Sequence, residues 1–200
     1  MPMWKWSVLS VSVLLGQKWD TLAVIETAYG TMRLQLYRQT PLHRANFLKL
    51  AKEGFFDGTT FHRVVPGFVI QGGDPNSKDS DPSNDGMGGP GYTIPAEIRP
   101  ELKHIRGAVG AARLGDNINP SRASNGSQFY IVVAEQGTPF LDGSYTVFGQ
   151  VIEGIEVADK IVAVERDGRD RPLQNISMKV RLERHKIKAL LKRYGHVYRL

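Results

Sequence analysis

Short apolar stretches, each ended by Gly, Pro, Asn or Asp, are the feature that most constrains the fold of this chain. Met32, Leu34 and Leu36 alternate with polar residues, and another apolar run precedes them at 22–27. Alternation gives a strand one buried face, and the short Ala-Tyr-Gly link between the two runs indicates a hairpin. Similar runs recur at 60–64, 68–71, 107–112, 128–133, 146–151 and 176–182. Without a repeating strand–helix–strand order, they predict an all-β antiparallel barrel or sandwich.

Only two helices are predicted within this β-rich region. Thr40-Pro41 opens the first, because Thr is a good N-cap and Pro a good first helical residue, and Gly54 ends it. The second helix is predicted over 155–162. Two long loops, 76–92 and 114–126, are rich in Asp, Asn, Ser, Gly and Pro, and their length hints at a functional surface.

The composition removes several classes of chemistry. A chain of 200 residues suits a single domain, and with no cysteine it has no disulfide, thiolate ligand or thiol nucleophile. The five histidines lack the spacing of metal ligands, and no run of 18 apolar residues could span a bilayer. We therefore expect no metal site.

Charge and composition divide the chain into three parts. Residues 1–20 form a leader, 21–182 the domain, and 183–200 a basic amphipathic helical tail. Residues 179–200 hold eight Lys or Arg and one Glu, so their net charge is +7. Because the net charge of the whole chain is +6, residues 1–178 carry a net charge of −1. A near-neutral domain is a poor candidate for wrapping nucleic acid.

The two ends each allow more than one interpretation. In the tail, Ile187, Leu190, Leu191 and Tyr194 have helical spacing, so the helix either docks on the domain or binds an anionic partner such as lipid or ribosomal RNA. In the leader, one Lys precedes a short apolar stretch, which resembles a secretory signal and implies export to the periplasm or cell envelope. The other interpretations are an added strand or a disordered leader in a cytoplasmic protein, which we expect to be a monomer.

The familiar catalytic motifs are absent, including the Gly-x-Ser-x-Gly elbow and the phosphate-binding loops. What stands out is Phe-His-Arg-Val-Val-Pro-Gly-Phe-Val-Ile-Gln-Gly-Gly-Asp over 61–74, with Asn-Gly-Ser-Gln-Phe-Tyr-Ile over 125–131 and Phe-Leu-Asp-Gly over 140–143. These segments offer one Arg, two Gln and several apolar groups without an acid–base pair. Taken singly, each segment fits a barrel core with a surface Arg.

The three segments together resemble the cyclophilin family of peptidyl-prolyl isomerases, over about residues 22–182. The resemblance implies a closed eight-stranded antiparallel barrel capped by two helices, to which this chain would add its C-terminal basic helix. It also implies rotation of X–Pro bonds in proline-containing polypeptides, in support of protein folding, without a cofactor. An alternative is a module that binds proline peptides with little turnover and is tethered by the basic tail.

The resemblance also implies which residues act. Arg63 would donate to the prolyl nitrogen of the twisted amide, and Gln71 would brace Arg63 and the substrate. The implied substrate-binding positions are Phe68, Val69, Ala112, Arg113, Gln128, Tyr130, Phe140, Leu141 and Tyr145. Members known as drug targets differ from this chain at five of these positions. They carry Met in place of Val69, Asn in place of Arg113, Phe in place of Tyr130, Trp in place of Phe140 and His in place of Tyr145. Arg113 adds charge at the rim, so we expect a preference for acidic sequences near proline.

Overall fold

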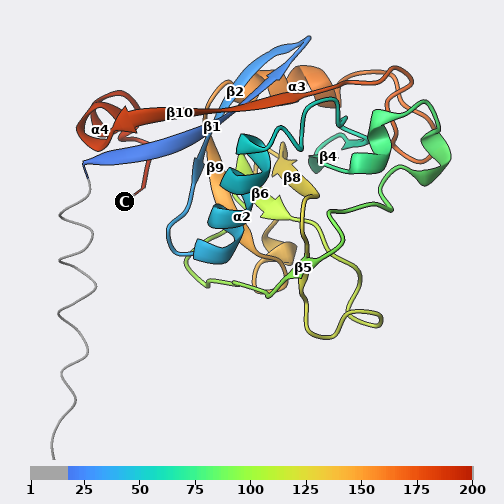
Figure 1. The fold of residues 1–200 in the computed structure, drawn as a ribbon, viewed down its shortest axis with the longest axis horizontal. Helices are drawn as coiled ribbons and strands as arrows, with labels where there is room; N and C mark the ends of the chain where they lie inside the picture. Colours follow the sequence, from blue (N-terminus) through green and yellow to red (C-terminus); the bar gives the residue numbers. More distant parts are fainter. Residues whose placement is uncertain (1–17, 200) are drawn as a thin grey trace, which may run out of the picture.

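The computed structural model describes residues 18–199 (Figure 1). Residues 1–17 of the predicted leader lie outside the described residues, and Trp19 and Asp20 at its end belong to the first strand. Its main sheet has eight strands in the order β10-β1-β2-β9-β6-β8-β4-β3, and every pairing is antiparallel. The strands of this sheet are β1 (Trp19–Thr27), β2 (Gly30–Leu36), β3 (Arg63–Val65), β4 (Val69–Gly72), β6 (Ala108–Ala111), β8 (Phe129–Val132), β9 (Val147–Glu153) and β10 (Lys179–Lys186). A second small sheet pairs β5 (Thr93–Ile94) with β7 (Ser124–Asn125). The predicted antiparallel all-β sheet is thus present.

The prediction of a closed barrel is wrong, because the sheet stays open between β3 and β10. The segments that precede these two strands touch through a bridge between Thr60 and Ser177 and a hydrogen bond from the Gly58 amide to the Met178 carbonyl at 3.0 Å. β3 is three residues long, and the Val64 amide donates to the Asp170 carbonyl at 2.7 Å. A loop therefore occupies the edge of β3 that a closing strand would need.

The first helix, α2 (Pro41–Lys52), begins where the sequence predicts, but its cap differs. The Thr40 side chain makes no cap hydrogen bond. Instead, the amides of Leu42 and His43 donate to the Glu97 carboxylate at 3.1 and 3.0 Å. A carboxylate from a distant loop thus satisfies the free amides and complements the positive end of the helix dipole.

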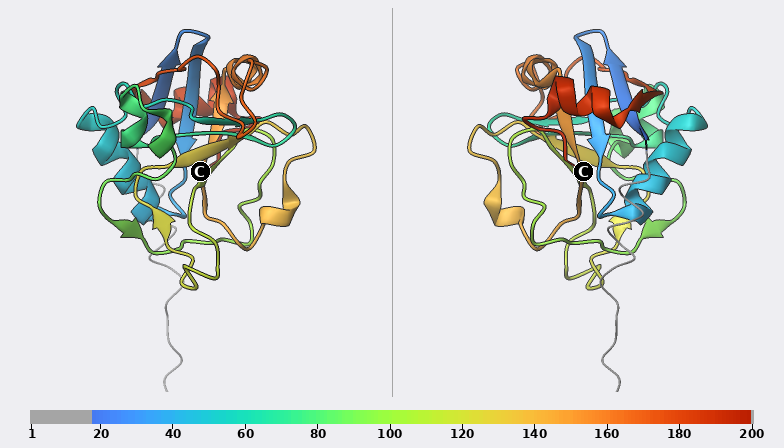
Figure 2. Two further views of the ribbon diagram at one scale, coloured as in Figure 1. Left: turned by 90° about the vertical axis from the view of Figure 1, so that its right-hand side faces the viewer. Right: turned by 90° about the vertical axis from the view of Figure 1, so that its left-hand side faces the viewer.

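The second helix, α3 (Ile155–Val162), matches its predicted range. Figure 2 shows α2 and α3 on separate sides of the sheet. Both helices send apolar side chains into one core: Phe47 and Leu50 from α2, and Val157 and Ile161 from α3. Three short 3-10 turns, Pro75–Lys78, Pro82–Asn84 and Pro139–Leu141, lie in the loops.

The C-terminal segment is divided rather than wholly helical. Residues 183–186 continue β10 and pair with the start of β1, so only Ile187–Tyr194 forms a helix, α4. The apolar side of α4 docks on the outer face of the sheet, where Leu190 and Tyr194 pack with Leu22. Beyond α4, the Tyr198 hydroxyl donates to the buried Asp20 carboxylate at 2.6 Å. No helix within residues 18–199 is long and apolar enough to cross a bilayer.

Candidate active site

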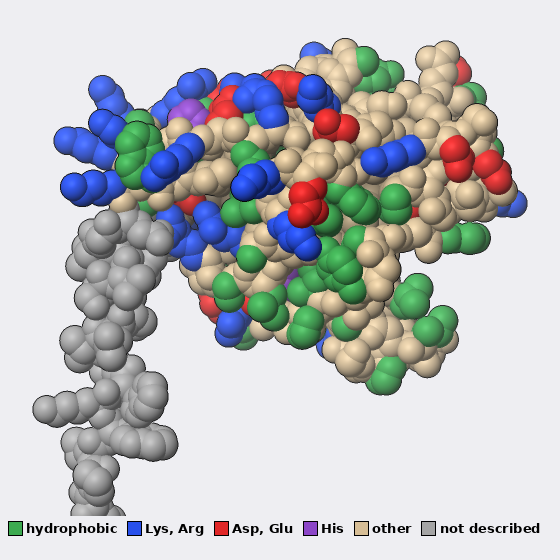
Figure 3. All heavy atoms as spheres, viewed as in Figure 1, with side chains coloured by type: hydrophobic (Ala, Val, Ile, Leu, Met, Phe, Trp, Pro, Cys, Tyr) green, Lys and Arg blue, Asp and Glu red, His purple; other side chains and the backbone are tan. Residues whose placement is uncertain are grey.

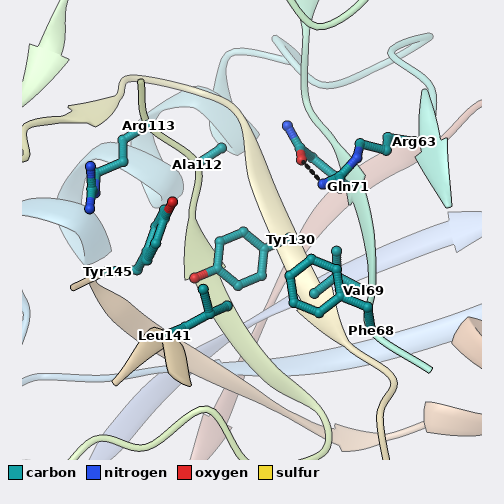
Figure 4. A pocket seen from close by; sticks show the side chains of 9 residues that line it. All are labelled: Arg63, Phe68, Val69, Gln71, Ala112, Arg113, Tyr130, Leu141 and Tyr145. Carbon is teal, nitrogen blue, oxygen red and sulfur yellow. Dashed lines mark hydrogen bonds between the residues drawn. The ribbon is translucent and has the colours of Figure 1, made fainter. Parts of the chain in front are cut away.

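Two short strands place the predicted catalytic pair side by side. β3 and β4 are joined by a tight Pro66-Gly67 turn, in which Gly67 has a φ of 70° that favours glycine. The turn sets Arg63 opposite Gln71 across the ladder. The Arg63 guanidinium donates to Gln71 Oε1 at 3.3 Å (Figure 4). The pairing register thus brings these two side chains together.

A chain of amide hydrogen bonds continues from Gln71 into the loop that follows β4. Gln71 Nε2 donates to Gln128 Oε1 at 3.1 Å, and the buried Gln128 amide donates to the carbonyls of Gly86 and Gly88 at 2.9 and 2.8 Å. The buried Asp74 carboxylate holds the same loop by accepting the Gly86 and Gly88 amides. Arg63 is therefore oriented through neutral groups, and none of the ion pairs formed by residues 18–199 includes it. Its charge remains available to a ligand.

A pocket of about 250 Å³ opens beside Arg63 and Gln71. Figure 4 shows Phe68, Tyr130 and Leu141 grouped at one side and the two polar side chains at the other. Tyr130 and Leu141 are buried, and the Arg63 guanidinium lies 5.8 Å from the Phe68 ring centroid. An apolar hollow edged by one cation suits a small apolar ring next to a hydrogen-bond acceptor.

Nine of the eleven predicted site residues line this pocket. They are Arg63, Phe68, Val69, Gln71, Ala112, Arg113, Tyr130, Leu141 and Tyr145. Gln128 lies instead in an adjoining hollow of about 350 Å³. Phe140 is 71% exposed and stacks on the outer side of Phe68, with ring centroids 5.6 Å apart. The structure thus brings most of the predicted set together and places these two at its margins.

Arg113 does not supply the free rim charge that the sequence suggested. Its side chain is only 4% exposed and forms an ion pair with Asp116 at 2.6 Å. Its guanidinium also lies 4.2 Å from the Tyr145 ring centroid and donates to the Ser144 carbonyl at 3.0 Å. Because Asp116 offsets the charge, the expected preference for acidic sequences has no support here.

The buried His104, paired with the half-buried Asp142, fixes the hydroxyl of Tyr130, and the sequence did not predict this pair. His104 Nδ1 lies 2.8 Å from Asp142 Oδ1, and Nε2 lies 2.9 Å from the Tyr130 hydroxyl. Burial lowers the pKa of His104, so the ring is neutral at pH 7. Since the Asp142 carboxylate only accepts, it takes the Nδ1 proton, and the Tyr130 hydroxyl donates to Nε2. The bond anchors the ring that backs the pocket.

The loops around the site hold further residues that the sequence did not single out. Leu114 and Ile118 are exposed apolar side chains that line the adjoining hollow with Asn119. The only signal was that they interrupt an otherwise polar, turn-rich loop. Among residues 18–199, no three His, Asp or Glu side chains are grouped to hold a metal ion.

Stability is expected to fall as the pH drops below about 6.5. Burial lowers the pKa of His43, His62 and His104 from 6.5, so the unfolded chain binds more protons than the native one just below that pH. Each of these histidines then lowers the free energy of unfolding by up to about 1.4 kcal/mol for each unit by which the pH falls. Urea unfolding at several pH values should give a flat free energy of unfolding between about pH 7.5 and 8.5 and a decline below 6.5. A rise toward pH 5.5 would contradict the burial argument.

Comparison with known proteins identifies the class of protein to which this fold and this pocket belong. The family model described as cyclophilin type peptidyl-prolyl cis-trans isomerase/CLD matches residues 22–181. The chain therefore belongs to the cyclophilin family. It is a cyclophilin-type peptidyl-prolyl cis-trans isomerase, as the relatives below also indicate.

Several relatives carry the same activity in their names. A peptidyl-prolyl cis-trans isomerase from Synechococcus elongatus is 42% identical over 154 residues, covering 72% of this chain and 95% of the relative. The isomerase ppi1 of Schizosaccharomyces pombe is 38% identical, covering 77% of this chain and 93% of its own. A crystal structure of a Cryptosporidium parvum cyclophilin with the dipeptide Ala-Pro matches with a TM-score of 0.71. It is 33% identical and covers 82% of this chain and 99% of that one.

Proposed function

We propose that Arg63 accelerates X–Pro rotation by donating a hydrogen bond to the prolyl nitrogen of the twisted amide. The observation that carries this proposal is the guanidinium at the pocket edge, oriented by Gln71 and outside every ion pair of residues 18–199. Amide resonance sets a rotational barrier of about 18–20 kcal/mol. Twisting removes that resonance and leaves a nitrogen that accepts a hydrogen bond. The Arg63 guanidinium therefore stabilises the twisted transition state more than it stabilises either planar form.

The remaining pocket residues support the same mechanism by holding the substrate. Phe68, Val69, Tyr130 and Leu141 supply an apolar socket for the proline ring, and Gln71 can contact the peptide backbone beside it. The dipeptide Ala-Pro named for the Cryptosporidium parvum structure is the kind of ligand that such a socket fits. The pocket is complete within one chain, so we propose that the protein acts as a monomer.

We further propose that the substrates are folding polypeptides, so that the enzyme assists protein folding. Uncatalysed X–Pro exchange takes tens to hundreds of seconds and limits the folding of many chains. The pocket is open at the surface, and an extended groove continues past Ala112 and Gln128 into the adjoining hollow. A segment of an unfolded chain can therefore enter it without a lid having to move.

A refolding experiment tests this function against simple peptide binding. The substrate is a small protein whose slow refolding phase is limited by one prolyl isomerisation. The wild-type chain at about one-hundredth of the substrate concentration should speed that phase several-fold, because each molecule turns over many times. Acceleration only at equimolar amounts, or retardation, would indicate a binding module instead.

A further inference from the structure

One end of the molecule carries a concentration of positive charge far from the active site. We define the cationic end as Lys18, Arg184, Lys186, Lys188 and Lys192, all of them exposed. The ladder of β1 and β10 brings them together, because Trp19 pairs with Lys186 and Thr21 with Arg184, and α4 follows directly. Figure 3 shows Lys and Arg side chains crowded over this end.

The carboxylates near the cationic end are already engaged by other groups. Asp20 accepts from Arg44 at 2.7 Å and from Tyr198, and it also pairs with Arg38. Glu183 pairs with Arg33 at 3.2 Å and with Arg181. Within residues 18–199, none of the ion pairs includes a member of the cationic end. Five uncompensated like charges repel one another, so an anionic surface that covers them gains energy.

A hollow with an aromatic wall lies within this region. It measures about 380 Å³ and is lined by Lys18, Trp19, Asp20, Thr21, Arg38, Arg44 and Arg184. Trp19 is 42% exposed, and the cationic groups of Arg184 and Lys186 lie 4.9 and 5.7 Å from its ring centroid. An exposed tryptophan between cations is the combination favoured at the boundary of phosphate headgroups and acyl chains.

We propose that the cationic end docks this isomerase on a membrane surface that contains anionic phospholipid. Lipid fits better than nucleic acid because apolar groups accompany the charge: Trp19 and Leu191 are both exposed. The sequence that leads into Lys18 adds Trp4, Trp6 and a mainly apolar stretch over 8–15 that is interrupted by Ser10 and Ser12. One cationic patch or one apolar segment binds a bilayer only weakly, but the two signals together give stable association. Nothing else in the chain favours nucleic acid, since residues 1–178 sum to −1.

This arrangement leaves the catalytic pocket free. Arg63 and Gln71 lie on β3 and β4, and Figure 1 shows β4 well away from α4 and from the end of β10 that leads into it. No residue of the cationic end lines the pocket. The proposal therefore stands or falls independently of the catalytic mechanism, and docking should not change peptide turnover.

Vesicle co-sedimentation of the full chain tests the proposal. We expect binding to phosphatidylcholine vesicles that contain phosphatidylglycerol, weak binding to phosphatidylcholine alone, and loss of the difference in about 0.5 M NaCl. The test variant combines Arg184→Gln, Lys186→Gln and Lys188→Gln. The control combines Lys52→Gln, Lys78→Gln and Lys160→Gln, which remove the same charge from α2, a 3-10 turn and α3. Unchanged peptide isomerisation by both variants verifies that they are folded.

The test variant should bind anionic vesicles roughly 100-fold more weakly than the wild type, at about fivefold for each cation removed. The control should lose far less. Equal binding by the two variants would overturn the proposal, and so would equal binding to both kinds of vesicle. Trp4→Ser/Trp6→Ser should weaken binding without abolishing the preference for anionic lipid. Tighter binding to a duplex oligonucleotide than to the vesicles would also overturn it, in favour of a nucleic-acid partner.

Discussion

Replacing Arg63 by Ala is expected to lower kcat/KM for an X–Pro peptide by about 10- to 100-fold. The variant loses a charge-assisted hydrogen bond, worth about 1.5–3 kcal/mol, that forms fully only in the twisted state. The pocket keeps its apolar walls, so KM should change less than kcat. A protease-coupled or magnetisation-exchange assay of a short Ala-Pro peptide measures both.

Two controls separate this role from a general effect of charge or of mutation. Arg63→Lys keeps the charge but loses the planar fork that can hold Gln71 and the substrate at once, so its activity should fall between wild type and Arg63→Ala. Arg99→Ala removes an exposed guanidinium that donates to the Gln39 carbonyl and does not line the pocket, so it should be neutral. If folded Arg63→Ala retained full activity, the mechanism would be wrong.

Phe129→Ala is expected to produce the largest loss of stability, about 3–5 kcal/mol in the free energy of unfolding. Phe129 is almost fully buried, and its ring lies 5.5, 5.9 and 6.3 Å from those of Phe47, Phe56 and Phe61. Truncation leaves a cavity where α2 and two loops meet β8. For a chain of this size, Tm should drop by about 10 °C. Denaturant unfolding and calorimetry measure the two quantities.

Phe140→Ala is the matched control, since it makes the same chemical change at an exposed position. Phe140 contacts mainly the Phe68 ring, so its loss should change the free energy of unfolding by about 0.5 kcal/mol or less. Similar losses in the two variants would show that the aromatic cluster around Phe129 does not dominate the core.

The strands and the catalytic segments could be predicted because each leaves a local trace in the sequence. The alternation around Leu34 fixes which face of β2 enters the apolar core, and Pro66-Gly67 fixes the turn that sets Arg63 opposite Gln71. The start of α2 and both ends of α3 likewise follow from residues within or next to the helices.

What the sequence could not provide depends on partners far along the chain. β3 does not pair with β10, because the loop that carries Asp170 bonds to the free edge of β3. The cap of α2 comes from Glu97, 55 residues from Leu42, rather than from Thr40. The His104 bond to Tyr130 spans 26 residues and has no local pattern. The spacing of apolar residues predicts which side chains are buried, but it does not predict which polar groups, far apart in the sequence, form hydrogen bonds.

The bond between Asp20 and Tyr198 has a consequence for how the protein is made. The two residues are 178 positions apart, and Asp20 sits in the first strand of the fold. During synthesis, the outer face of β1 therefore stays bare until residues 187–198 have been made. We expect this face to be covered last, after the rest of the sheet has paired.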